Sequence, residues 1–234
     1  MLKSKKKLIE YKLFYKIYLL YFYFKFKLKY LIKKKSYSQF GEDLIIDKFF
    51  KNFRGKYVDI GCFHPIKYSN TLLLYKRGWN GLNIDLNPAS IDLFKISRTR
   101  DSSILACLSD KKKNVVIYYD DHFSALNSIS KENSKNFRIK NFKKIKTKTK
   151  VFKDIVKENF DFLNIDAEGQ DFKILKTIDL KKFTPKLINI EVEPINKKNI
   201  YKYLGDNGYK ILKIKSASHI FKKRLTKFSS FLHR

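Results

Sequence analysis

The segments GKYVDIGCFHP (Gly55–Pro65) and GLNIDLNP (Gly81–Pro88) decide the fold class of this chain. The first contains a short apolar run that stops at Gly61, as a buried parallel strand does before a tight turn. The second contains another such run, which ends at Asp85, 24 residues after Gly61. Ligands of open α/β sheets bind beyond the carboxyl ends of the strands. The segments therefore predict one crevice, where Gly61 admits a ligand to the backbone and Asp85 binds ribose hydroxyls. An ordinary parallel strand with a turn glycine is the alternative interpretation.

The loop after the first strand favours an adenosine cofactor without phosphates. A dinucleotide site needs G-x-G-x-x-G, so that a pyrophosphate can sit at a helix N-terminus. This loop offers Gly61 alone, followed by the bulky run Cys62–Pro65, which would crowd a pyrophosphate. An acid such as Asp59 suits a positively charged ligand and would repel a phosphate. S-adenosylmethionine, which carries a sulfonium and an ammonium group, fits both features.

Length and charge set the broad class. At 234 residues the chain is long enough for one α/β domain with an appendage. Its formal net charge of +30, from 52 Lys and Arg against 22 Asp and Glu, by itself favours a polyanionic partner. Only seven of the 52 are arginine, the residue that reads bases and forks onto phosphates, so we do not expect nucleic acid as the partner. The lysine excess accords with an AT-rich genome.

Cysteine and histidine usage bears on the compartment. The two cysteines, Cys62 and Cys107, have no metal-ligand or redox spacing and are expected to be buried free thiols. Such thiols suit a reducing compartment, which predicts a cytoplasmic protein. The four histidines are too scattered along the chain to predict a metal cluster.

Residues 1–35 form a separate compositional zone. They hold twelve lysines and one acid, Glu10, interleaved with an aromatic and aliphatic run from Leu13 to Ile32. Lysines interrupt this run, so a spanning helix of about 20 apolar residues is not available, and no small-residue cleavage site indicates a secretory signal. Two interpretations remain: a basic helix on the inner, anionic face of a membrane, or an extra helix packed on the domain. We expect the domain to cover residues 36–215 and a basic tail to cover residues 216–234.

Periodicity and turn residues predict the order of elements along the domain. A helix within Ser38–Phe53 leads into the first strand. A helix capped by Ser69 precedes the second strand, and Pro88 begins a helix that runs to Ser97. This is a β-α-β-α-β unit, right-handed by rule. Further strands are expected at residues 103–108, 115–119, 143–150, 162–166, 187–192 and 209–214, with helices through 172–175 and from 197 to about 204.

With these segments in order, the chain resembles the FkbM family of S-adenosylmethionine-dependent methyltransferases. The motifs that carry the resemblance are SQFGEDLII (Ser38–Ile46), VDIGCFHP (Val58–Pro65), YSNTLLLYKRGWNGLNIDLNP (Tyr68–Pro88), RTRD (Arg98–Asp101), SALNSISKE (Ser124–Glu132) and FLNIDAEGQDFKIL (Phe162–Leu175). The chain departs from the family at Cys62, usually a small residue, and at Gln170-Asp171, often an apolar residue or His followed by Glu. The resemblance implies an α/β, class I (Rossmann-like) fold, with a mostly parallel seven-stranded sheet flanked by helices and an antiparallel final strand. It also implies O-methylation of a hydroxyl.

The resemblance implies roles for individual residues as well. Asp59 and Gly61, with Cys62 beside them, would border the methionine portion of the cofactor. Asp85 would bind the ribose, and Leu86 would flank the adenine, whose edge Ser109 or Asp110 would face. Asp166 and Glu168 would face the methyl donor and the acceptor. Glu42 and Asn70 would be further contributors to the cofactor site.

Methyl transfer from a sulfonium depends on positioning and on a base for the acceptor proton. The candidates for that base are Asp166, Glu168 and His64. Each has a simpler alternative: Asp166 holds the cofactor's amino group, Glu168 caps the next helix, and His64 packs beside Pro65. A divalent metal on Asp166, Glu168 and Glu193 is a further alternative, although carboxylates at strand ends are common in this fold.

The acceptor expected from the resemblance and the basic segment is a sugar hydroxyl of a surface polysaccharide or of its lipid-linked precursor. Residues 1–35 would then touch the membrane peripherally. The alternative function is a non-catalytic membrane- or nucleic-acid-binding protein on a methyltransferase-like scaffold. The sequence leaves the oligomeric state open.

Overall fold

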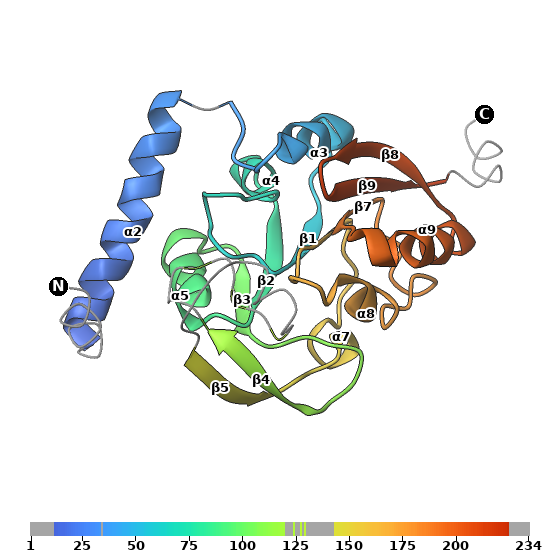
Figure 1. The fold of residues 1–234 in the computed structure, drawn as a ribbon. Helices are drawn as coiled ribbons and strands as arrows, with labels where there is room; N and C mark the ends of the chain where they lie inside the picture. The colour runs from blue at the N-terminus through green and yellow to red at the C-terminus, as the bar shows by residue number, and fades with distance from the viewer. Residues whose placement is uncertain are drawn as a thin grey trace.

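The computed structural model describes residues 12–33, 35–119, 124, 127, 129 and 143–224, and a seven-stranded sheet forms its centre (Figure 1). Residues 1–11 of the predicted extension, residues 225–234 of the predicted tail and most of the motif Ser124–Glu132 lie outside the described residues.

The sheet has the strand order β3-β2-β1-β6-β7-β9-β8. Its strands are β1 (Lys56–Ile60), β2 (Asn80–Asp85), β3 (Ser102–Leu105), β6 (Phe162–Ile165), β7 (Leu187–Glu191), β8 (Tyr209–Lys215) and β9 (Ser218–Lys223). The strands from β3 to β7 pair in parallel, whereas β9 runs antiparallel to both of its neighbours. The predicted mostly parallel sheet with an antiparallel final strand is therefore confirmed.

Helices connect the strands in the predicted order. They are α3 (Glu42–Phe50), α4 (Leu72–Lys76), α5 (Pro88–Ser97), α7 (Phe152–Ile155), α8 (Asp171–Leu175), the 3-10 helix η1 (Pro194–Asn196) and α9 (Lys197–Asp206). The start of α5 shows why the local signals were sufficient, because Asn87 accepts a hydrogen bond from the amide of Ala89 at 3.0 Å and Pro88 is the first helical residue. A separate antiparallel pair, β4 (Asn114–Tyr119) and β5 (Lys143–Lys148), matches the two predicted extra strands.

Two predicted boundaries differ from the structure. The strand expected at residues 103–108 ends at Leu105, and Leu108 makes only an isolated bridge to Lys150. The segment after residue 215, expected as a tail, contributes β9, which inserts between β7 and β8. The turn into β9 uses Ser216 with a φ of 53°, and neither Gly nor Pro marks it in the sequence.

The two faces of the sheet have different character. Val58 and Ile60 of β1 belong to the main apolar core, which α7, α8 and α9 cover. Asp59 points to the other face, where it lies in a buried polar row with Asn83 of β2 and Asn164 of β6. Because strand side chains alternate, this polar row is fixed by the register of the strands and cannot reach the first face.

Helix α2 (Lys12–Lys33) lies along the side of the domain, beside α5 (Figure 1). Leu19 and Tyr30 are buried, and the hydroxyl of Tyr15 donates a hydrogen bond to Asp92 of α5 at 2.7 Å. The alternative of an extra helix packed on the domain is thus observed. Within the described part of the chain, no helix has the length and apolar character needed to cross a bilayer.

Candidate functional site

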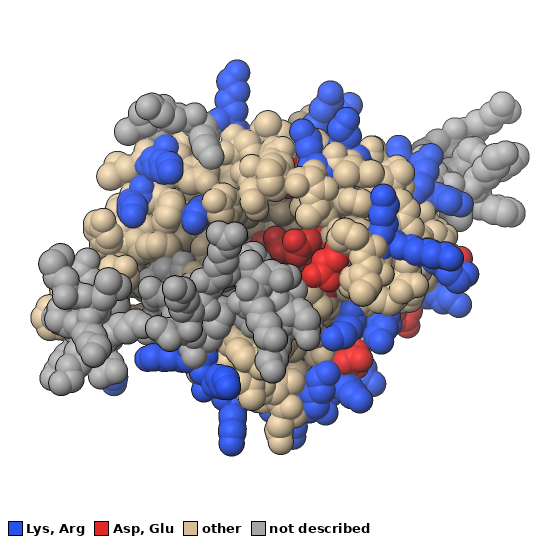
Figure 2. All heavy atoms as spheres, viewed as in Figure 1, with Lys and Arg blue, Asp and Glu red and all other residues tan. Residues whose placement is uncertain are grey.

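A cavity of about 340 Å³ opens beyond the carboxyl ends of β1, β2, β6 and β7. This is the place where open α/β sheets bind ligands. Figure 2 shows acidic atoms gathered in a hollow near the middle of this face, with Lys and Arg side chains around its outer parts. The predicted residues that line the cavity are Gly61, Asp85, Leu86, Asp166 and Glu168.

Gly61 forms part of the cavity wall by a close backbone approach. Its amide donates to the carbonyl of Ile84 at 2.8 Å, and its φ of 75° is left-handed. A Cβ at this position would lie 1.7 Å from the carbonyl oxygen of Asp166. Only glycine therefore allows the ends of β1 and β6 to meet here.

Asp85 stands at the end of β2 with a carboxylate oriented by the backbone. One oxygen accepts from the amide of Phe63 at 2.8 Å, and the other accepts from the amide of Asn87 at 2.8 Å. Burial raises the pKa of Asp85 to about 6. Carboxylate oxygens retain acceptor capacity beyond one bond each, so this group can also accept from the hydroxyls of a ligand.

Phe63 and Tyr68 form an aromatic side of the cavity. Their rings stack with centroids 6.4 Å apart, and both residues have a left-handed φ, of 48° and 57°. Both line the cavity, and Tyr68 is exposed, which places the pair at the cavity mouth. The ammonium of Lys67 lies over the Tyr68 ring at 4.5 Å.

Three carboxylates line the opposite side of the cavity. Asp166 follows β6 and Glu191 ends β7, and the pairing of Ile165 with Ile190 brings these two acids side by side. Glu168 follows in the next turn and also lines the cavity. No lysine, arginine or histidine is among the described residues that line it. In a chain with a net charge of +30, an acidic cavity without a basic lining residue marks a site for a cation.

The carboxyl groups on the acidic side of the cavity have raised pKa values. Burial, and then the neighbouring Glu191, raises the pKa of Asp166 well above its usual value. Burial raises the pKa of Glu191 to about 8 and that of Glu168 to about 7, with Asp171 as the next cause for both. Desolvation and like charges both disfavour ionisation, and a bound cation would reverse the second effect.

The turn that carries Glu168 is braced from α8. Glu168 has a left-handed φ of 48°, and Gly169 follows with 86°. The carboxylate of Asp171 accepts from the amides of Ala167 at 2.8 Å and Gly169 at 3.2 Å. A strained, non-glycine left-handed residue in a braced turn is a feature that clusters at functional sites.

The structure does not bring Asp59 and Asn70 into the cavity lining. The two oxygens of Asp59 accept from the side chains of Asn164 and Thr71, each at 2.8 Å. Asn70 donates to Asn164 at 3.0 Å. Both residues therefore belong to the buried polar row on the other face of the sheet.

Glu42 and Cys62 are also outside the lining. Glu42 is buried and accepts from the amide of Phe40 at 2.8 Å, whereas Gln39 of the same segment does line the cavity. Cys62 is buried against Ile91 and Phe94 of α5.

Ser109 and Asp110, predicted to face the adenine edge, do not line the cavity. Ser109 is buried, and its hydroxyl lies 3.4 Å from the side-chain oxygen of Gln170, a lining residue. Asp110 faces Lys113 and Lys176, at 3.8 Å and 3.6 Å. The preceding residues Cys107 and Leu108 provide the lining instead.

His64 lies under α2 and not in the cavity. Its Nδ1 accepts from the amides of Ile66 and Lys67, each at 3.0 Å, and its ring packs against Phe22 and Phe26. Burial, and then Lys67, lowers the pKa of His64 to about 3. Of the three proposed bases, only Asp166 and Glu168 therefore line the cavity.

No role was predicted for Glu191. Its position at the end of a predicted strand was the signal that could have placed it in the cavity. Gln39, Cys107 and Gln170 also line the cavity. Their positions depend on loops whose paths no local sequence pattern fixes. In the described part of the chain, no group of three or more His, Cys, Asp or Glu is arranged to hold a metal ion, and Asp166, Glu168 and Glu193 are not gathered as such a group.

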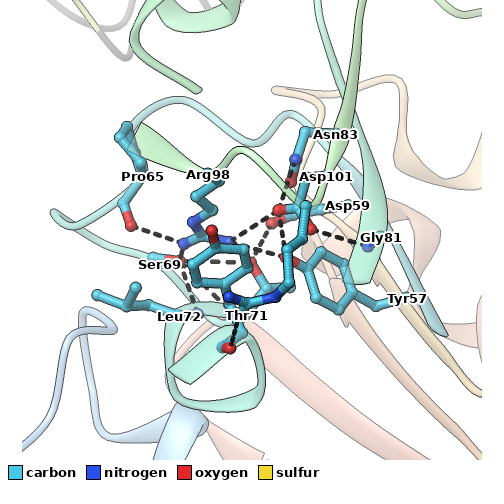
Figure 3. A network of polar contacts seen from close by, with 12 residues as sticks. Tyr57, Asp59, Pro65, Ser69, Thr71, Leu72, Gly81, Asn83, Arg98 and Asp101 are labelled. Carbon is cyan, nitrogen blue, oxygen red and sulfur yellow. Dashed lines mark hydrogen bonds and ion pairs between the residues drawn. The ribbon is translucent and has the colours of Figure 1, made fainter. Parts of the chain in front are cut away.

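A second buried polar cluster, around Arg98, holds the loop that follows β1 (Figure 3). The guanidinium donates to the carbonyl of Pro65 at 2.6 Å and to the hydroxyls of Ser69 at 2.7 Å and Thr71 at 2.8 Å. It also lies 3.8 Å from the carboxylate of Asp101. The RTRD motif is therefore structural, since it fixes the loop that carries Phe63 and Tyr68.

Comparisons with known proteins bear on the family and the fold of the chain. Residues 59–211 match the family described as the methyltransferase FkbM domain. Among solved structures, methyltransferase FkbM from Methylobacillus flagellatus KT is similar over 73% of this chain, with 12% identity and a TM-score of 0.51. This chain covers 44% of that protein's chain, and at this identity the likeness shows the fold alone.

Two other similar structures have lower TM-scores. A TehB-like SAM-dependent methyltransferase from Corynebacterium glutamicum has 14% identity and a TM-score of 0.46, with 85% of this chain and 93% of that chain covered. A putative RNA methyltransferase from Pyrococcus horikoshii has 9% identity and a TM-score of 0.44, with 79% and 83% covered. No curated protein matches the sequence. Because the family match spans more than half of the sequence, the chain belongs to the FkbM methyltransferase family.

Proposed function

We propose that the protein transfers a methyl group from S-adenosylmethionine to a sugar hydroxyl of a surface polysaccharide or of its precursor. The observation that carries the proposal is the cavity at the strand ends, which is lined by Asp85 on one side and by Asp166, Glu168 and Glu191 on the other. A ligand that is both a nucleoside and a cation matches these two sides.

The residues present fit this cofactor. Asp85, already oriented by two backbone amides, would accept from the ribose hydroxyls. Gly61 lines the cavity and allows the end of β6 to approach the end of β1. Asp166 and Glu191, which share a hydrogen bond, would face the ammonium and sulfonium charges. Ionised carboxylates favour such charges most in a buried site.

The cofactor, when bound, supplies an electrophilic methyl group, so the protein has to position the acceptor and receive its proton. Glu168 is the residue we assign to that proton. It lines the cavity, and its pKa of about 7 lies near the ordinary working pH, where a general base is most effective.

The aromatic pair Phe63 and Tyr68 supports the proposal that the acceptor is a sugar. Flat rings at the mouth of a cavity offer a surface on which the C–H faces of a sugar can pack while its hydroxyls stay hydrogen-bonded. The stacked rings and the nearby ammonium of Lys67 suit a glycan that also carries an anionic group.

The cofactor assignment is tested by calorimetry with the variant Asp85→Asn. We expect the affinity for S-adenosylmethionine to fall about a hundredfold, because the ribose loses a charged acceptor in a buried site. Asp206→Asn is the matched control, since Asp206 is exposed and pairs with Lys202 at the end of α9. Equal affinity in Asp85→Asn and the wild type would contradict the ribose assignment.

The reaction is tested by transfer of labelled methyl groups into glycan extracts, beside small hydroxylated metabolites. Glu168→Gln should keep cofactor affinity and lose about a hundredfold or more in turnover. Glu158→Gln, an exposed acid paired with Lys56, should leave turnover unchanged. Label in metabolites but not in glycans would overturn the acceptor class and leave the methyltransferase assignment standing.

A further inference from the structure

Helix α2 presents two apolar faces on opposite sides. Its inner face meets the domain through Leu19, Phe22, Phe26 and Tyr30. Its outer face carries six large apolar side chains that are each between 46% and 66% exposed: Leu13, Ile17, Leu20, Tyr21, Phe24 and Leu28. At about 100° per residue these six positions fall in one stripe about 100° wide, on the side of the helix away from the inner face.

Lysines border the outer face along both edges. Lys16 and Lys27 lie along one edge and Lys25 lies along the other, each within about 40° of the stripe, whereas Lys12 and Lys29 lie nearer the inner face; all five are exposed. The helix contains no acid.

We propose that the outer face of α2 docks on the surface of an anionic lipid bilayer. The apolar stripe enters the boundary between headgroups and acyl chains, and the lysine side chains on both edges extend to anionic headgroups. The pattern of one stripe with basic edges is that of a helix that lies in the interface plane.

Charge distinguishes an anionic bilayer from the other partners that could cover the outer face of α2. In a complex with a second copy through the same face, the lysine edges of the two helices would repel one another. A nucleic acid would meet an apolar stripe and a helix without arginine. An anionic bilayer is the partner that offers both an apolar layer and negative charge along two edges.

Docking through α2 also determines where the cavity lies relative to the bilayer. The ammonium of Lys67 lies over the ring of Phe26 in α2 at 5.1 Å and over the ring of Tyr68, at the cavity mouth, at 4.5 Å. The mouth is therefore about one helix diameter, roughly 10 Å, from the docked face. The docking proposal itself does not depend on the proposed reaction.

The test is co-sedimentation of the full chain with vesicles of phosphatidylcholine containing about 30% phosphatidylglycerol. The outer-face variant replaces four exposed side chains: Leu13→Gln, Ile17→Gln, Phe24→Gln and Leu28→Gln. It keeps every lysine, so a purely electrostatic attraction would leave its binding unchanged. We expect its partition coefficient to fall at least tenfold, because the buried apolar area is lost.

The matched control places the same four changes on other exposed positions, none of which lines the cavity: Ile145→Gln, Ile195→Gln, Ile211→Gln and Ile214→Gln. This control should bind vesicles like the wild type, and circular dichroism and thermal melting should show that both variants are folded. Equal binding by the outer-face variant and the wild type, or no wild-type binding to anionic vesicles, would overturn the proposal.

Two further measurements locate the contact. Phe24→Trp should be quenched by brominated phosphatidylglycerol, whereas Ile195→Trp should not, and the native Trp79 is fully buried and gives a constant background. Sedimentation velocity without lipid should show the same state for the wild type and the outer-face variant. A dimer that the outer-face changes dissociate would assign the face to a second copy and overturn the bilayer proposal.

Discussion

Two buried polar clusters lie near the end of β1 and differ in their balance of charge. Around Arg98, one cation meets the carboxylate of Asp101 and a set of hydroxyl and carbonyl acceptors. At the cavity, Asp166, Glu168 and Glu191 face one another, and no basic side chain lines the site among the described residues. In the first cluster a cation is paired with a carboxylate, whereas in the second the described charged groups are all acidic.

This difference separates structural from functional polar groups. Buried charges that are paired and hydrogen-bonded stabilise one arrangement of the chain. Buried charges of one sign raise the free energy of the folded protein and favour a ligand of the opposite sign. The clusters should therefore respond oppositely to the removal of a charge.

The largest effect is expected in the Arg98 cluster. Arg98→Met removes the cation beside Asp101 and the guanidinium hydrogen bonds to the Pro65 carbonyl and the Ser69 hydroxyl, all in buried positions. We expect the free energy of unfolding to fall by about 3–5 kcal/mol, measured by urea denaturation. Arg98→Lys should recover part of this loss.

The control for this prediction is Arg77→Met. Arg77 pairs with Asp47 at 2.6 Å, but the two side chains are about one-third exposed. We expect a loss of at most about 1 kcal/mol. Similar losses at Arg77 and Arg98 would show that the buried cluster carries no special structural role.

The next effect concerns Gly61, which joins the loop held by Arg98 to the cavity. Gly61→Ala places a Cβ against the carbonyl of Asp166 in a left-handed conformation. The expected loss is about 2–4 kcal/mol in the free energy of unfolding. Gly205→Ala is the control, because no atom lies within 4 Å of a Cβ there. Since Gly205 is in α9, this change should stabilise by about 0.5–1 kcal/mol. Unchanged stability in Gly61→Ala would contradict the close approach.

The parts of the fold that the sequence predicted are those with local signals. Pro88 and Asn87 determine the start of α5, and the predicted helix ends at Ser97 as observed. Strand β9 was missed because its partner β7 is distant in sequence and its turn at Ser216 contains no glycine. Pairing between distant strands is not encoded in a local pattern.

The residues of the site that the sequence predicted are likewise those with local signals. Among the predicted residues that line the cavity are Gly61, Asp85, Asp166 and Glu168. They could be predicted because each stands at or shortly after the end of a strand that the sequence indicates. Asp59 lies between Val58 and Ile60 in β1, and strand alternation directs it to the face opposite theirs, where Thr71 and Asn164 bind it. For His64, the deciding neighbours are Phe22 and Phe26 of α2, whose packing no pattern near His64 indicates.

The third effect is a pH dependence of cofactor affinity. The pKa values of Asp85 and Glu191 are raised to about 6 and 8, so these groups lose protons as the pH rises through that range. Affinity for cationic S-adenosylmethionine should rise with them. S-adenosylhomocysteine lacks the sulfonium charge, so its affinity should rise less, and the ratio of the two affinities should grow about tenfold from pH 6 to pH 8.

Calorimetry in buffers of different ionisation enthalpy checks this prediction directly. Binding of S-adenosylmethionine at pH 7 should release protons from the acidic side of the cavity, because the cation favours the ionised carboxylates. A constant affinity ratio together with no proton release would show that these acids do not face the cofactor's charge.

The smallest effect is expected from Glu191→Gln, and its sign is opposite to that of Arg98→Met. The pKa of Glu191 in the folded protein, about 8, lies above the ordinary value of about 4.3, so its ionisation costs folding free energy as the pH rises between them. Without cofactor, Glu191→Gln should therefore be more stable than the wild type by at least about 1 kcal/mol at pH 8, and equal to it at pH 4. Glu158→Gln, an exposed acid paired with Lys56, should show no such gain.

Saturating S-adenosylmethionine should reverse the order, because the wild type then gains the charge partner that its acidic cluster lacks. A loss of stability in Glu191→Gln at pH 8 without cofactor would mean that the acidic cluster is balanced within the protein, as the Arg98 cluster is.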